Sequence, residues 1–296
     1  MDFQTIQNKM LKVVISPVAA ELKSIKDGAG NEYLWQGDPE YWKKQAVNLF
    51  PYIGRLTEGC YTHNGKRYEM NRHGFLPESE MSVEAAYEDY VCFLLRESQK
   101  TLVAYPFTFE LRIKYKLEDN RINITFEVLN TGKECMYFGI GGHPGFRVPL
   151  DSGLSFDDYY LEFSEKSEPT LIGLSEACYP NGTDKKYSLK DEKIIPLYHG
   201  LFDNDAIMFR DMPRKVTLKS DKGNKAVAVT YPDMQFIAFW HPVKKDAPFV
   251  CIEPWTSLPS RDGILEDLAT QPDLISLEPG KQYSNTWTIE IKGCEG

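Results

Sequence analysis

The chain has 296 residues, of which 42% are hydrophobic and 26% charged, a composition typical of a globular protein with a large buried core. Lysine and arginine number 34 against 43 aspartate and glutamate residues, so the formal net charge is -9, which argues against nucleic acid or an anionic membrane as a partner. No stretch approaches the roughly 18 apolar residues that span a bilayer. The N-terminus has no basic segment followed by an apolar run, so we expect a cytoplasmic protein.

Short strands joined by turns account for most of the chain. Hairpins are predicted to turn at Asp27-Gly28 and at Asn64-Gly65. Apolar and polar residues then alternate on both arms of a hairpin over residues 111–128, so one face of each arm is predicted to cover a core. Another hairpin turns at residues 221–224, and a last strand covers residues 287–291. This pattern is typical of an antiparallel sheet protein.

Helical periodicity is nearly absent. Only residues 41–47 and 263–269 have a spacing that suits two helical turns, and neither stands between two predicted strands. A doubly wound α/β fold is therefore excluded. Because the chain also lacks a linker and a fixed repeat, we predict a single all-β domain over residues 1–296, built as one large, largely antiparallel sandwich with few short helices.

Two of the five histidines stand in segments that suit a functional site. His73 is followed by Gly74 and Phe75, and His143 lies in the sequence GIGGHPGF, which begins at Gly139. Glycines let a ligand or another backbone approach closely, and four of them in seven residues predict an irregular backbone. A structural role for each imidazole remains equally open. The other three, which lie beside turns, are expected to be structural, with the first of them in solvent: His63, His199 and His241.

Glu253 ends an apolar strand and is followed by Pro254 and Trp255. Burying an unpaired carboxylate costs several kcal/mol, so Glu253 needs a partner or an accessible site. One alternative is a structural ion pair with Arg261. The other is a functional carboxylate beside an aromatic ring that stacks on a sugar or another ring-shaped ligand. Arg55 is similarly placed, behind a proline and a glycine at the start of a strand.

Five short segments follow one another in a distinctive order. They read YLWQGDP from Tyr33, LFPYIGRL from Leu49, HGF from His73, GHPGF from Gly142 and IEPW from Ile252. In order and approximate spacing the chain resembles the aldose 1-epimerase (mutarotase) family, specifically its LacX-like branch. The match extends from about Asn31 to the segment Leu277-Glu278-Pro279-Gly280, which is nearly the whole chain.

The resemblance implies a galactose-mutarotase-like β-supersandwich whose open face binds a pyranose. The expected activity is that of an isomerase that interconverts the α and β anomers of an aldohexose of the galactose or glucose type, without a cofactor or a metal. By family analogy Glu253 is the base and His143 the acid that open and close the ring. A carboxylate and an imidazole also suit proton transfer near neutral pH. We expect a small-molecule hexose as the partner and a monomer or homodimer.

The resemblance also implies a set of sugar-binding residues. His73 and Arg55 would bind ring hydroxyls and polarise the ring oxygen, and Trp255 would recognise the ring. The family also uses an acidic residue on a later strand to hold sugar hydroxyls. Asp203 and Asp205 are the candidates, and we favour Asp205 because it directly precedes an apolar strand.

Three alternatives remain open at this stage. The first is a non-catalytic carbohydrate-binding protein on the same fold, and the second is a metal site of His73, His143 and Glu253. The third is a hexose 6-phosphate mutarotase. Arg55 and Arg72 flank the site motifs, but the family often has an arginine shortly after His-Gly-Phe, and here Pro77 replaces it. We therefore expect free galactose or glucose to be preferred to the 6-phosphates.

Overall fold

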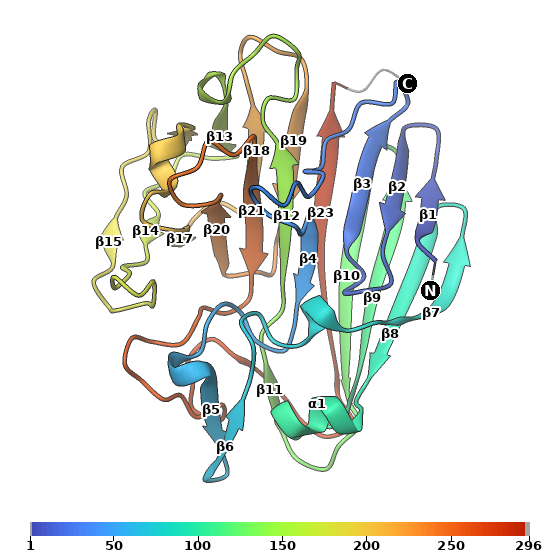
Figure 1. The fold of residues 1–296 in the computed structure, drawn as a ribbon, viewed down its shortest axis with the longest axis vertical. Helices are drawn as coiled ribbons and strands as arrows, with labels where there is room; N and C mark the ends of the chain where they lie inside the picture. Colours follow the sequence, from blue (N-terminus) through green and yellow to red (C-terminus); the bar gives the residue numbers. More distant parts are fainter. Residues whose placement is uncertain (1, 294–296) are drawn as a thin grey trace.

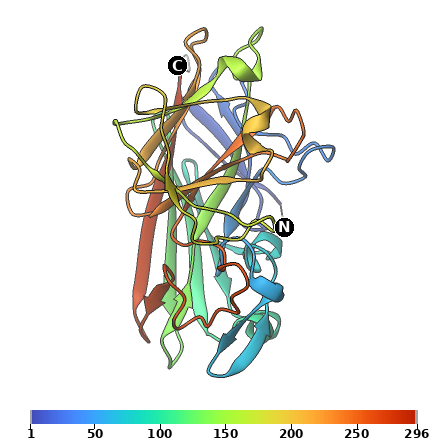
Figure 2. The ribbon, with the colours of Figure 1, turned by 90° about the vertical axis from the view of Figure 1, so that its left-hand side faces the viewer.

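Two large antiparallel sheets make up most of the computed structural model, which describes residues 2–293 (Figures 1 and 2). The larger sheet has nine strands, in the spatial order β16 (Ile194–Pro196), β13 (Tyr160–Phe163), β18 (Lys215–Lys219), β19 (Ala226–Thr230), β23 (Gln282–Lys292), β10 (Arg121–Asn130), β9 (Phe109–Glu118), β8 (Tyr90–Arg96) and β7 (Ser82–Tyr87). The smaller sheet has seven, in the order β15 (Lys185–Lys186), β14 (Thr170–Leu171), β17 (Ile207–Arg210), β20 (Phe236–Trp240), β21 (Phe249–Trp255), β12 (Gly141–Arg147) and β4 (Ala46–Leu49). The prediction of an all-β, antiparallel fold is confirmed.

Smaller sheets and short helices complete the fold. Three further sheets are formed by β1 (Gln4–Gln7), β2 (Leu11–Ile15) and β3 (Leu22–Asp27), by β5 (Cys60–His63) and β6 (Lys66–Glu69), and by β11 (Met136–Phe138) and β22 (Ile275–Leu277). The described residues contain one α-helix, α1 (Gln99–Ala104), and four 3-10 helices, at Thr57–Gly59, Leu76–Glu78, Phe156–Asp158 and His199–Phe202. Within residues 2–293, no helix is long and apolar enough to cross a membrane.

The alternating hairpin forms as its sequence predicts. Strands β9 and β10 pair with Tyr115 opposite Ile124, and buried and partly exposed residues alternate along both arms. The hairpins at Asn64-Gly65 and at residues 221–224 also form, as β5–β6 and β18–β19. These turns are determined by local sequence, which is why they can be read from it.

The two predicted helical stretches are wrong. Residues 41–47 form turns that lead into β4, and residues 263–269 form an irregular loop. Both are shorter than an isolated helix needs to be stable, so tertiary contacts decide their conformation. The helix that does form, α1, begins after Ser98, whose hydroxyl accepts a hydrogen bond from the backbone N–H of Thr101 as an N-cap.

The glycine-rich segment before His143 also differs from expectation, because residues 141–147 form the regular strand β12. The lack of a side chain at Gly142 allows close packing between the smaller and the larger sheet. A Cβ atom added to Gly142 would lie 2.4 Å from Cζ2 of Trp287, a buried residue of β23 in the larger sheet. The two sheets therefore pack closely beside His143, on the face of β12 that points away from that imidazole.

The expectation of a solvated His63 is wrong as well. Its side chain is buried and contacts the rings of Phe107 and Tyr137. The five cysteines within the described residues are free thiols, whereas Cys294 lies outside the described residues.

Substituting Gly142→Ala is expected to destabilise the protein by about 1–3 kcal/mol, because the new methyl group collides with Trp287 in a packed core. Urea unfolding followed by circular dichroism measures the change. Gly200→Ala is the matched control, since the nearest atom to its added Cβ lies 3.5 Å away, and it should change the free energy of unfolding by less than about 0.5 kcal/mol. Equal stability of the two variants would contradict the packing argument.

Candidate active site

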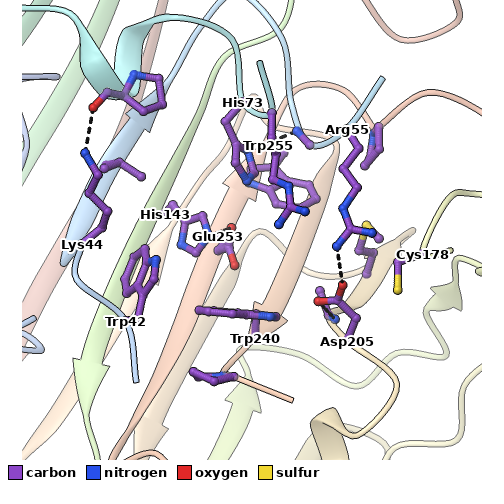
Figure 3. A pocket seen from close by; sticks show the side chains of 18 of the residues that line it. Trp42, Lys44, Arg55, His73, His143, Cys178, Asp205, Trp240, Glu253 and Trp255 are labelled. Atoms are coloured by element: carbon purple, nitrogen blue, oxygen red, sulfur yellow. Dashed lines mark hydrogen bonds and ion pairs between the residues drawn. The ribbon is translucent and has the colours of Figure 1, made fainter. Parts of the chain in front are cut away.

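A cavity of about 470 Å³ opens over the central strands of the smaller sheet (Figure 3). It is lined by residues from strands β12, β20 and β21 and from the loops around them, among them Trp42, Lys44, Arg55, Arg72, His73, His143, Cys178, Asp205, Trp240, Glu253 and Trp255. This size is typical of small-molecule sites. All the residues that the sequence singled out as catalytic or sugar-binding, His143, Glu253, Arg55, His73, Asp205 and Trp255, lie on this one cavity.

His143 and Glu253 meet because their strands are neighbours. Strands β12 and β21 pair with Gly141 opposite Trp255 and Gly145 opposite Cys251, so His143 and Glu253 lie across from each other between these pairs. Residues directly opposite in an antiparallel pair project from the same face. Nε2 of His143 lies 3.2 Å from Oε2 of Glu253. The sequence alternative in which Glu253 pairs with Arg261 is wrong, because the guanidinium of Arg261 donates to Glu266.

Aromatic rings enclose the imidazole of His143. Trp42 stacks on it with ring centroids 4.8 Å apart and an angle of 26° between the planes. Trp240 and His73 contact it edge-on, at 5.7 Å and 5.5 Å. Only 8% of His143 and 1% of Glu253 is exposed to solvent, so the pair sits in a low-dielectric wall of the cavity.

Burial shifts the pKa of both groups toward their neutral forms. Desolvation raises the pKa of the Glu253 carboxyl well above its usual value, and the carboxylate of Asp205 adds to the effect. Desolvation lowers the pKa of His143 to about 3. Electrostatic attraction between Nε2 of His143 and Oε2 of Glu253, which lie 3.2 Å apart, favours the ion pair instead. In both the neutral and the ionic arrangement, the two residues together hold one proton.

Polar atoms of the site are left without partners in the protein. Nδ1 of His143, Oε2 of Glu253 and Nε1 of Trp255 are buried and make no hydrogen bond within the described residues. Buried polar atoms are normally hydrogen-bonded, so these unsatisfied atoms distinguish the wall of the cavity from an ordinary core.

The backbone fixes the tautomer of His73. The N–H of Gly54 donates to Nδ1 of His73 over 3.1 Å, and the backbone N–H of His73 donates to the carbonyl of Gly54. A neutral imidazole that accepts at Nδ1 carries its proton on Nε2. Burial and the neighbouring His143 lower the pKa of His73 well below its usual value, so His73 is a neutral hydrogen-bond donor.

Left-handed backbone conformations occur in the loops that carry Arg55 and His73. Gly54 and Gly74 have φ angles of 69° and 77°, and His73 itself has a φ of 66°. A Cβ atom on Gly74 would lie 2.2 Å from the carbonyl oxygen of Phe50, and one on Gly54 would lie 2.4 Å from Cγ of Pro259. Only glycine suits both positions.

Arg55 faces Asp205 across the other side of the cavity (Figure 3). One of its terminal nitrogens lies 3.4 Å from Oδ2 of Asp205, and the other donates to the carbonyl of Ala177. Of the two acidic candidates, Asp205 lines this cavity, whereas Asp203 lines a neighbouring crevice on which Arg55 and Asp205 also border.

Sequence reasoning missed several cavity residues, among them Trp42, Lys44 and Trp240. Trp42 lies in the stretch that was read as helical, and Trp240 precedes His241, which was read as structural. Lys44 stands in no motif. Two of the three histidines read as structural contact each other, with Nδ1 of His199 lying 3.3 Å from Nε2 of His241.

The residues on the cavity fit a metal poorly. Among the described residues, the group whose ligand atoms come together is His143, Cys251 and Glu253, within 4.8 Å, rather than the set with His73 that the sequence suggested. Burial raises the pKa of the Cys251 thiol well above its usual value. A metal binds the thiolate and the carboxylate, so the neutral forms favoured here oppose it.

Known proteins match nearly the whole chain. The model of the aldose 1-epimerase family matches residues 2–290. Protein LacX, encoded on a plasmid of Lactococcus lactis subsp. lactis, is 35% identical over 289 residues, which cover 94% of this chain and 96% of the relative.

Two solved structures have the same fold over nearly their whole length. A galactose mutarotase related enzyme from Lactobacillus acidophilus is 34% identical, with a TM-score of 0.94, and the match covers 98% of this chain and 97% of that one. A galactose mutarotase-like protein from Lactobacillus casei ATCC 334 is 29% identical, with a TM-score of 0.93, and covers 98% and 100%. The chain belongs to the aldose 1-epimerase family and has the fold of the galactose mutarotase-like proteins.

Proposed function

We propose that the protein is a mutarotase that interconverts the α and β anomers of an aldohexose of the galactose or glucose type, with no cofactor or metal. Family membership supports a sugar isomerase. The observation that carries the proposal is the contact of His143 with Glu253 on the wall of a hexose-sized cavity. Location in the cytoplasm, a single domain and a monomeric or homodimeric state belong to the same proposal.

Anomerisation needs two proton transfers on neighbouring oxygens of the sugar. A base takes the proton of the anomeric hydroxyl, an acid protonates the ring oxygen, and the bond between C1 and the ring oxygen breaks to give the open-chain aldehyde. Rotation about C1–C2 and reclosure, with the roles reversed, give the other anomer. We assign Glu253 as the base and His143 as the acid in ring opening, roles that use the ion-pair arrangement that their 3.2 Å contact favours.

The contact distance supports this assignment. Since the two oxygens that exchange protons are both bonded to C1, the acid and the base must lie close together, and Nε2 and Oε2 are 3.2 Å apart. A pair that holds one proton has both a donor and an acceptor available. Ring opening transfers a proton in and a proton out, so the pair returns with its single proton and is ready for reclosure.

The remaining side chains suit sugar binding. His73, with its proton on Nε2, can donate to a sugar oxygen, and Arg55 with Asp205 offers both donors and acceptors to hydroxyl groups. The rings of Trp42, Trp240 and Trp255 give the cavity apolar walls. The carbohydrate-binding alternative has the same walls and the same donors, so it differs from the mutarotase only in that it needs no acid and no base.

Removing either member of the pair should abolish most of the activity. His143→Asn and Glu253→Gln keep the approximate shape, and each should lower kcat by about 10²–10⁴-fold with little change in stability. Exchange NMR between the two anomeric protons of the sugar measures the rate, and thermal unfolding checks the fold. Near wild-type turnover in a folded variant would remove that residue from the mechanism. Sugar binding with no exchange in the wild-type protein would favour the carbohydrate-binding alternative.

The rate should follow a bell-shaped pH profile with an unusually acidic lower limb. Activity is lost on the acid side when the pair gains a second proton and on the alkaline side when it loses its only one. Because burial lowers the pKa of His143 to about 3, activity should persist well below the ordinary imidazole value of about 6.5. Measuring kcat/KM from about pH 4 to pH 9 tests this. An acid limb centred near pH 6.5 would contradict the one-proton pair.

Chelation is expected to leave the rate unchanged. The neutral forms of Cys251 and Glu253 that burial favours are poor metal ligands, so dialysis against EDTA should remove nothing that the reaction needs. Elemental analysis before and after dialysis is the control. A rate that falls with EDTA and returns with zinc would replace the proposed acid-base pair by a metal mechanism.

A further inference from the structure

The imidazole of His143 lacks the hydrogen bond that usually orients a proton-transferring histidine. Its Nε2 lies 3.2 Å from Oε2 of Glu253, which is itself the proposed base, and Nδ1 makes no hydrogen bond within the described residues. In many acid-base sites the second ring nitrogen donates to a third group, which fixes the ring. Rotation of an imidazole about its outer side-chain torsion is otherwise only loosely restricted. Other contacts must therefore set the ring plane of His143.

Trp42 covers one face of that imidazole. Its indole stacks on the ring of His143 with centroids 4.8 Å apart and 26° between the planes. Trp240 and His73 meet the same ring edge-on, with angles of 81° and 77° between the planes. Edge contacts limit how far a ring slides, whereas a stacked ring resists tilting, because tilting opens a gap on one side and a clash on the other. Among the ring contacts of His143 within residues 2–293, the one with Trp42 therefore fixes its plane.

The opposite face of Trp42 is covered by the protein as well. Phe249 lies on β21 four residues before Glu253, on the same side of the sheet, and its ring stacks on Trp42 at 5.9 Å and 19°. Trp42 fills the space between His143 and Phe249, over Gly145 of β12. A Cβ atom added to Gly145 would lie 3.3 Å from Cζ3 of Trp42 and 3.2 Å from Cδ2 of Phe249. With protein rings on both faces, the indole offers a sugar only its edge.

Hydrogen bonds hold the backbone of Trp42 in place. Nε1 of Trp35 donates to the carbonyl of Trp42 over 2.8 Å, and the backbone N–H of Trp42 donates to the carbonyl of Asp38 over 3.0 Å. Trp35 is buried, and its own ring stacks on Phe249 at 4.5 Å and 23°. The rings of Trp35, Phe249, Trp42 and His143 therefore form a continuous stack, which ties the imidazole to a buried cluster outside the cavity.

We propose that Trp42 is a positioning residue for the reaction, whose stacked indole holds the imidazole of His143 in the plane that keeps Nε2 beside Glu253 and the sugar. The inference rests on the proposed anomerisation, in which His143 is the acid. Trp42 takes the place of the hydrogen-bonded third group that orients the histidine of other acid-base sites. Sequence reasoning assigned residues 41–47 to a helix and gave Trp42 no function.

The stacking contact matters most while the proton moves. As Glu253 takes the proton of the anomeric hydroxyl, its contact with Nε2 gives way to a contact with the sugar, and His143 keeps no other hydrogen bond within the protein's described residues. A ring that turned at that moment would lose its alignment with the ring oxygen, and a misplacement of about 1 Å can cost about 100-fold in rate. The face of an indole also attracts an imidazolium, so Trp42 favours the protonated acid.

Two other interpretations of Trp42 predict different effects. As a platform for the sugar, Trp42 would act on binding and therefore on KM, but both of its faces are already covered. As packing alone, it would act on stability and leave kcat unchanged in folded protein. As a positioning residue, it acts on kcat, and only through His143.

The test compares two substitutions of Trp42 in one assay. Exchange NMR gives kcat and KM for glucose and galactose, each corrected for spontaneous exchange, and thermal unfolding verifies that each variant is folded. Trp42→Leu removes the ring and keeps an apolar side chain, and it should lower kcat by about 10- to 100-fold while KM changes by less than about threefold. Trp42→Phe restores a flat ring, and its kcat should lie within about fivefold of the wild type.

Two further variants separate positioning from packing. Phe163→Leu is the matched control for the loss of a ring, since Phe163 is buried in β13 of the larger sheet and does not line the cavity. It should lower the melting temperature yet keep kcat within about twofold of the wild type. In the His143→Asn background, Trp42→Leu should lower the residual rate by less than about twofold, because the imidazole that Trp42 positions is gone.

The outcomes are distinct. A Trp42→Leu variant that raises KM at unchanged kcat, or that keeps both constants of the wild type, overturns this inference and leaves the proposed mutarotase intact. A Trp42→Phe variant as slow as Trp42→Leu overturns it too, as does a loss that persists at full size in the His143→Asn background. No exchange of either sugar by the wild-type protein overturns the proposed function, and this inference with it.

Discussion

The contact between His143 and Glu253 sets the conditions that the surrounding structure meets. Two ionisable side chains can lie 3.2 Å apart in the middle of a buried sheet only if their strands are neighbours in a fixed register, and β12 and β21 provide this. Burial then costs free energy for each charged form, so the pair holds one proton rather than two or none. The reaction we propose needs that state, and the register of the sheet supplies it.

The rest of the site follows from how the strand and loop backbones are positioned around that pair. Gly142 lets the larger sheet come close behind His143, with Trp287 filling the space where a side chain would stand. In front of the pair, Gly54 and Gly74 take left-handed conformations that bring the loops of Arg55 and His73 over the cavity. Glycine thus serves two purposes here, close packing at one position and backbone conformation at the others.

Sequence reasoning succeeded where information is local and failed where contacts are distant. The alternation over residues 111–128 predicts a hairpin because each residue's burial depends on its own position in the strand. The run of glycines before His143 was interpreted as irregular backbone, since nothing in the sequence reveals that Trp287 lies behind it. Glu253 finds its partner on the neighbouring strand rather than in Arg261, which is only eight positions away in the chain but is bound to Glu266.

Motifs in the sequence revealed one part of the candidate site and missed the other. Arg55, His73, His143, Asp205, Glu253 and Trp255 stand in or beside motifs and were all found, and the structure brings them to one cavity. Lys44 and the two tryptophans that enclose His143 are brought to the cavity by the packing of β4 and β20 against their neighbours, which no short motif records.

Lys44 also shows why net charge and site charge answer different questions. The net charge of -9 governs how the whole chain interacts with a polyanion. A polyanion is longer than the screening length of about 8 Å at physiological salt, so it senses charges over much of the surface. Inside the cavity the field depends on the charged groups that line it, which are the cations Lys44, Arg55 and Arg72 and the acids Asp205 and Glu253. The acidic composition therefore argues against nucleic acid but places no limit on a small anion, because the field inside a cavity is determined by the few side chains that line it.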